Sequence, residues 1–117
     1  MLNQLTVTLI HEDPKFSAQL SALLESHQMP VTTISTIDDL DENNINTSMI
    51  IIHETFPRLN LKKLLIANKL HRNALTLVLT NAVSGSYLES LLDSGADDYL
   101  TRPYTIEDIY QKLLSVY

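Results

Sequence analysis

Five polar side chains stand at or directly after the ends of short apolar runs: His11, Glu12, His53, Thr80 and Arg102. Imidazole and carboxylate groups can bind metal ions, a hydroxyl group can donate or accept a hydrogen bond, and a guanidinium group can bind an anion or pair with a carboxylate. Ligands of open α/β sheets bind in the crevice beyond the carboxyl ends of the strands. If the apolar runs are parallel strands, the five side chains share one crevice.

The apolar runs alternate with helical patterns along the chain. The predicted strands are Leu5–Ile10, Val31–Ile34, Met49–Ile52, Leu75–Leu79 and Tyr99–Leu100. Three of them are almost continuously apolar, as in a parallel sheet that is buried on both faces. Apolar residues at helical spacing predict a helix after each strand, although the segment near Ile37–Leu40 is long enough for only one or two turns. The sequence therefore predicts a single doubly wound α/β domain over residues 1–117, with a five-stranded parallel sheet and helices on both faces.

Residues that favour helix ends support these boundaries. Asp13 is a good N-cap for a helix that has Pro14 at its first position. Gly95 is suited to the left-handed residue that closes the fourth helix. Two pairs have the spacing of a capping box: Ser86 with Glu89, and Thr105 with Asp108.

The composition excludes several classes of function. The chain has 117 residues and a formal charge of −6, which argues against direct binding to nucleic acid or to an anionic membrane, because both need clustered Lys and Arg. Without cysteine it can form no disulfide, thiolate metal site or cysteine nucleophile. No apolar run reaches the roughly 18 residues of a membrane span, and no signal peptide is evident, so we expect a cytoplasmic protein. Gly-rich phosphate loops and other common catalytic motifs are missing, so we do not expect an enzyme.

Four segments, taken together, resemble the receiver domains of bacterial response regulators in two-component signal transduction. The resemblance covers nearly all of the chain in the right order and spacing. Gly95–Tyr104 is similar to the family's Gly-Ala-Asp-Asp-Tyr-hydrophobic-x-Lys-Pro-Phe, and the stretch from Ile51 to Pro57 is similar to its third strand with the ending Asp-x-x-x-Pro. The other two segments are Val7–Pro14, which resembles the first strand and its acid pair, and Leu77–Thr80, which resembles the fourth strand.

The resemblance implies a phosphorylation pocket whose charged positions have changed. In the family, an acid pair and an acceptor Asp hold magnesium, a Thr or Ser and a Lys contact the phosphoryl group, and an aromatic residue changes rotamer. The matching residues here are His11 with Glu12, then His53, Thr80, Arg102 and Tyr99. An acyl phosphate needs a carboxylate, and magnesium prefers oxygen ligands. We therefore expect no phosphorylation by the usual mechanism and no cofactor. The resemblance also implies a cis bond before Pro103.

Several roles in this pocket stay open. Asp13 is interpreted as a helix cap, although a register shifted by one residue would make Glu12 and Asp13 the acid pair. The two histidines are interpreted as polar fillers, with metal binding by His11, Glu12 and His53 as the alternative. Arg102 is expected to form a salt bridge with Glu12 or Asp13, or else to hold an anion or a partner's carboxylate. Tyr99 is either a packing residue or a switch.

The sequence thus predicts a degenerate receiver, or pseudo-receiver: a regulatory module that binds protein partners through its fourth helix, fifth strand and fifth helix. A metal- or anion-sensing module in the same pocket is the alternative. The fourth helix, residues 86–93, carries acids and no base, so two such faces would repel each other and the standard symmetric receiver dimer is not expected. The residues assigned to this face are Tyr87, Leu88, Glu89, Asp97, Asp98, Asp108, Tyr110 and Lys112.

Overall fold

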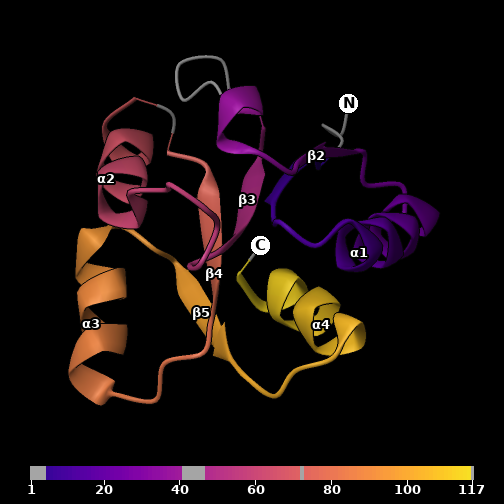
Figure 1. Cartoon of the computed structure of the whole chain (residues 1–117). Coiled ribbons are helices and arrows are strands. Elements are labelled where there is room, and N and C mark those ends of the chain that lie inside the picture. Colours follow the sequence, from indigo (N-terminus) through magenta and orange to yellow (C-terminus); the bar gives the residue numbers. More distant parts are fainter. Residues whose placement is uncertain (1–4, 41–46, 72, 117) are drawn as a thin grey trace.

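Five parallel strands form one sheet in the order β2-β1-β3-β4-β5. The computed structural model describes residues 5–40, 47–71 and 73–116. Figure 1 shows α1 and α4 on one side of the sheet and α2 and α3 on the other. The predicted doubly wound fold is confirmed. Its elements are β1 (Val7–Ile10), α1 (Pro14–Ser26), β2 (Val31–Ile34), β3 (Met49–His53), α2 (Leu61–His71), β4 (Leu75–Thr80), α3 (Gly85–Ser94), β5 (Asp98–Thr101) and α4 (Ile106–Val116).

Alternation along the central strand β3 divides the core into two clusters. Ile50 and Ile52 pack in the cluster with α2 and α3, whereas Met49 and Ile51 pack in the cluster with α1 and α4. All four are fully buried, and each such side chain contributes about 1.5–3 kcal/mol of burial free energy. Because β3 is covered on both faces, its sequence is a continuous apolar run rather than an alternating one.

The helix predicted between β2 and β3 was expected to be the shortest of the five. The segment near Ile37–Leu40 forms one 3-10 turn, Ile37–Asp39, and residues 41–46 lie outside the described residues. The helices expected as third, fourth and fifth are therefore α2, α3 and α4. The longest helix, α1, has 13 residues, and among the described residues no helix is both long and apolar enough to cross a membrane.

Most predicted helix ends are confirmed. Asp13 caps α1 by accepting hydrogen bonds from the backbone N–H groups of residues 15 and 16. Thr105 and Asp108 form a reciprocal capping box with distances of 2.8 and 3.0 Å. Gly95 closes α3 with φ of +123°. The Ser86 cap is wrong, because α3 begins at Gly85 and its N-cap is residue 84.

The structure also changes the bounds of four strands and fixes one peptide bond. Strand β1 begins at Val7 rather than at Leu5, and β5 spans Asp98–Thr101 rather than Tyr99–Leu100. Strand β3 includes His53 and β4 includes Thr80, so both residues are held in the sheet rather than after it. The bond between Arg102 and Pro103 is cis, as the resemblance implies. Three of the five predicted crevice residues are thereby positioned by β3, β4 and the end of β5.

Candidate functional site

A cleft of about 500 Å³ opens at the carboxyl edge of the sheet. It lies where the chain passes from β1 outward to β2 and then back to β3, which is the switch point at which ligands bind in this class of sheet. Four of the five predicted residues line it, whereas Thr80 does not. The lining residues are His11, Glu12, Asp13, Phe16, His53, Thr55, Asn81, Arg102 and Tyr104.

His53 at the end of β3 is only 8% exposed and is hydrogen-bonded through Nδ1. The Thr55 backbone N–H lies 3.2 Å from this nitrogen, and the Thr55 hydroxyl lies 2.7 Å from it. A backbone N–H can only donate, so Nδ1 is an acceptor and the neutral ring carries its proton on Nε2. The imidazole thus holds the next turn as the carboxylate of an Asx-turn does.

His11 repeats this arrangement at the end of β1. The Asp13 backbone N–H donates to His11 Nδ1 over 3.0 Å, so His11 also carries its proton on Nε2. The His11 ring stacks on Phe16 at 4.3 Å between centroids, and its edge-to-face contact with His53 spans 5.1 Å. The loop that follows each histidine therefore fixes the orientation of its ring, and the two rings also pack against each other.

Both histidines are neutral at neutral pH. Burial lowers the pKa of His11 below 6.5, and repulsion from His53 lowers it further. Burial also lowers the pKa of His53, outweighing the opposite effects of Glu54 and Glu12. The cleft therefore gains no positive charge from its imidazoles under ordinary conditions.

These hydrogen bonds work against a metal site. A metal ion would need the lone pair of Nε2, so the ring proton would have to move to Nδ1. There the proton would face the backbone N–H that now donates to Nδ1, and the two hydrogens would repel each other. Among residues 5–40, 47–71 and 73–116, no group of three His, Cys, Asp or Glu side chains is placed to hold a metal ion. Magnesium fits poorly as well, because imidazoles replace two of the oxygen ligands that it prefers.

Asp13 acts as a helix cap, which favours the register in which His11 and Glu12 occupy the family's acid-pair positions. Its Oδ1 accepts hydrogen bonds from the N–H groups of Lys15 and Phe16 at 3.0 and 3.4 Å. This carboxylate oxygen already accepts both of its hydrogen bonds from the first turn of α1.

The predicted salt bridge from Arg102 to Glu12 or Asp13 is wrong. Within the described parts of the chain, Arg102 is exposed and forms no ion pair. Its backbone N–H donates to the Thr80 carbonyl over 3.1 Å, which positions the residue at the rim of the cleft. Glu12 is exposed too, and an exposed ion pair of this kind contributes little free energy.

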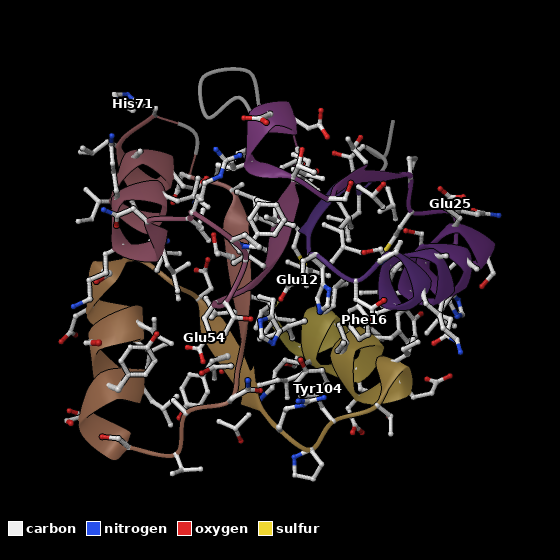
Figure 2. The ribbon with its side chains drawn as sticks, in the orientation of Figure 1. Glu12, Phe16, Glu25, Glu54, His71 and Tyr104 are labelled. Atoms are coloured by element: carbon white, nitrogen blue, oxygen red, sulfur yellow. The ribbon has the colours of Figure 1, made fainter. Side chains whose placement is uncertain are left out.

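Glu54, which was not predicted as a site residue, accepts two hydrogen bonds. The Asn81 backbone N–H donates to Oε1 over 3.0 Å and the Tyr87 hydroxyl donates to Oε2 over 2.8 Å. The Thr80 hydroxyl lies near the same carboxylate and helps to lower its pKa. The same hydroxyl accepts from the Ala82 N–H over 2.9 Å. In Figure 2, Glu54 lies toward α3, apart from Glu12, Phe16 and Tyr104 on the other side of the sheet edge.

The hydrogen bonds of this network favour an ionised Glu54 and a protonated Tyr87. Burial alone raises the pKa of Glu54, but the nearby Thr80 hydroxyl and the hydrogen bonds from Asn81 and Tyr87 outweigh it and leave the pKa below its usual value. Burial and the hydrogen bond to Glu54 raise the pKa of Tyr87 to about 12. One ionised carboxylate therefore ties the turn after β3, the turn after β4 and helix α3 together.

The aromatic residues predicted for the output face, Tyr87 and Tyr110, are largely packing residues. Tyr87 and Leu88 pack against the α2–α3 cluster, as does Tyr99, which was predicted to be either a packing residue or a switch. Tyr110 packs against the other cluster and stacks on His27 at 4.3 Å. The apolar side chains most exposed on these helices are instead Leu92 at 42% and Leu114 at 46%.

The charged residues of the same face are partly paired. Lys69 on α2 reaches Asp97 at 3.4 Å, and Lys112 on α4 reaches Asp98 at 3.3 Å. Glu89 is exposed and forms no ion pair with a described residue. Asp108 is exposed but caps α4.

Four further cleft residues were not predicted: Phe16, Thr55, Asn81 and Tyr104. Two of them had a usable signal in the sequence. Thr55 lies two residues after His53 and Asn81 directly follows Thr80, so both were bound to lie near the carboxyl edge. Phe16 belongs to a helical pattern and Tyr104 to the segment after a proline, and only the fold brings their rings to the cleft.

Solved structures of response-regulator receiver domains share this architecture. The chemotaxis response regulator CheY4 of Vibrio cholerae matches with a TM-score of 0.85 and 17% identity, covering 98% of this chain and 100% of that one. The receiver domain of Francisella response regulator 1452 matches at 0.81 with 24% identity over 97% of both chains. No protein-family model and no curated protein matches the sequence. The chain therefore has the CheY-like receiver fold over nearly its whole length.

Proposed function

We propose that the protein is an atypical receiver domain, a protein-interaction module of bacterial two-component signalling that does not accept a phosphoryl group at the usual position. The observation that carries the proposal is His53, which ends β3 at the position matching the family's acceptor aspartate. Its ring offers no carboxylate for an acyl phosphate, and its Nδ1 is occupied by Thr55. Its neighbour His11 removes a second oxygen ligand for magnesium.

The network around Glu54 supports a role without phosphate. In the receiver family, the hydroxyl at the Thr80 position contacts the phosphoryl group. Here that hydroxyl is fully buried and accepts from the Ala82 N–H, while Glu54 accepts from the Asn81 N–H in the same turn. These bonds support a turn after β4 that the chain's own side chains hold, and an output face that does not depend on phosphorylation.

The output face consists of α3, β5 and α4, as in the receivers that the sequence resembles. Its acids that form no ion pair with a described residue, such as Glu89 on α3, favour a basic or apolar partner surface and oppose a symmetric dimer, since like charges brought together at an interface can cost several kcal/mol. A cytoplasmic signalling partner of that character fits this surface.

Anion sensing in the cleft is the second candidate. Arg102 has no ion pair within the described residues, and His11 and His53 each carry an N–H on Nε2, so three donors belong to one cleft. Titration with acetate or phosphate, followed by chemical shifts of the three side chains, tests this candidate. Saturable shifts that vanish in Arg102→Ala support it, and their absence removes it.

Acetyl phosphate with magnesium is expected to leave the protein unmodified, because no acceptor carboxylate stands at position 53. Intact-protein mass spectrometry measures this, with a conventional receiver domain labelled in parallel as the positive control. His53→Asp alone is also expected to stay unlabelled, since His11 still replaces a metal ligand. A stoichiometric phosphoryl adduct on an Asp or Glu of the cleft would overturn the proposal.

A further inference from the structure

The basic residues are concentrated around α2. Between Thr55 and Leu88 the chain has five Lys or Arg residues and no Asp or Glu. The rest of the chain has the other three bases and all 14 acids. This region is thus basic in a protein whose formal net charge is −6, and the separation creates surfaces of opposite sign.

Helix α2 exposes an apolar stripe among lysines. Ile66 is 50% exposed and Leu70 is 74% exposed, and their spacing of four residues places them on the same side of the helix. Lys62 and Lys63 lie one turn before Ile66, and neither side chain is bonded to a described residue. We call these four residues the α2 face.

Helix α3 exposes a surface of the opposite charge. Leu92 is 42% exposed, and it lies three residues after Glu89 and next to Asp93 in the sequence. Both acids are exposed and unpaired within the described residues. We call these three residues the α3 surface. An apolar centre with acids beside it matches an apolar centre with lysines beside it.

We propose that the α2 face of one copy binds the α3 surface of a second copy, head to tail. This inference rests on the proposed function only in that α3 belongs to the output face. The two surfaces differ, so the contact is heterologous, and it brings opposite charges together where a symmetric α3 pairing would bring like charges together. Two short helices bury less than the roughly 1,200 Å² of a stable interface, so the association is weak and depends on concentration.

Charge reversal of each surface tests the contact by sedimentation velocity at about 0.1 M salt, where the net repulsion of the two copies is screened. The wild type is expected to self-associate as its concentration rises. Lys62→Glu/Lys63→Glu and Glu89→Lys/Asp93→Lys are each expected to weaken association about tenfold. The protein carrying all four substitutions restores opposite charges across the contact and is expected to associate within about twofold of the wild type.

A matched control separates local from net charge. Lys15→Glu/Gln19→Glu/Ser22→Glu adds four negative charges on exposed positions of α1, the same change as in Lys62→Glu/Lys63→Glu. It is expected to associate like the wild type. Equal weakening by this control would mean that net charge alone governs association, which overturns the proposal.

Three other outcomes also decide the matter. A wild type that stays monomeric up to about 0.5 mM overturns the proposal. Failure of the protein with all four substitutions to regain association overturns it as well. A mixture of the wild type with Glu89→Lys/Asp93→Lys that associates more strongly than either protein alone, with no effect of the α2 substitutions, would instead show a symmetric α3 dimer. The acetyl phosphate experiment is independent of all of these results, so the proposed loss of phosphorylation stands or falls separately.

Discussion

Replacing Glu54 with alanine is expected to lower the free energy of unfolding by about 2 kcal/mol. The substitution removes the acceptor for the Tyr87 hydroxyl and the Asn81 N–H together. The bond from the Tyr87 hydroxyl is partly buried, so its loss has a larger effect than the loss of an exposed bond. Urea denaturation of wild type and variant measures the difference.

Two milder variants separate the carboxylate from its surroundings. Tyr87→Phe removes one donor and is expected to lower stability by about 1 kcal/mol. Glu54→Gln keeps an acceptor oxygen but loses the charge, so the pKa of Tyr87 is expected to fall from about 12 toward its ordinary value of 10. Ring chemical shifts of Tyr87 against pH record that change. If Glu54→Ala is as stable as the wild type and the pKa of Tyr87 is unchanged, the network does not hold the turn after β4.

Lowering the pH from about 7.5 to 5.5 is expected to destabilise the wild type more than His11→Asn/His53→Asn. Both histidines have pKa values below 6.5 in the folded protein, chiefly because of burial, whereas in the unfolded chain they titrate near 6.5. Below that pH the unfolded state binds protons that the folded state does not. This contribution to stability is thus fully present above pH 6.5 and is lost as the pH falls.

Asparagine is a suitable replacement because its side-chain oxygen can accept a hydrogen bond from the same backbone N–H two residues ahead, as in an Asx-turn. The turns after β1 and β3 are thereby retained while the titration is removed. His27 and His71 remain in both proteins, so their contributions cancel. Melting temperatures measured across the range test this: parallel curves for the two proteins would contradict the assignment of both histidines as neutral with lowered pKa values.

The order of the elements follows from local patterns in the sequence. The apolar run of β3 requires cover on both faces, and a central position in a parallel sheet supplies it. Asp13 before Pro14 marks the start of α1, and the cap is present at the expected residue. Ser86 shows where local spacing fails, because the N-cap is residue 84, two residues before the predicted one. The predicted carboxyl ends of β3, β4 and β5 were each one residue short, and the predicted β1 began two residues too early.

Only part of the site could be predicted from the sequence. Residues that directly follow strands, such as His11 and Arg102, are brought to one edge by the topology alone, and both line the cleft. Their partners depend on side-chain rotamers, which spacing does not fix. Arg102 was expected to pair with an acid and instead lies in solvent, whereas Glu54, which follows His53, turns toward Thr80 and Tyr87.

Beryllofluoride binding tests the central claim most directly, because a receiver that accepts phosphate forms a tight magnesium-dependent beryllofluoride complex through its acceptor carboxylate. Two-dimensional NMR of the labelled protein, with magnesium alone and then with beryllofluoride, follows the backbone of Glu12, Glu54 and Asn81 at the edge of the cleft. We predict that the spectra with and without beryllofluoride superimpose. A stoichiometric complex in slow exchange, with shifts centred on the cleft and dependent on magnesium, would contradict the account.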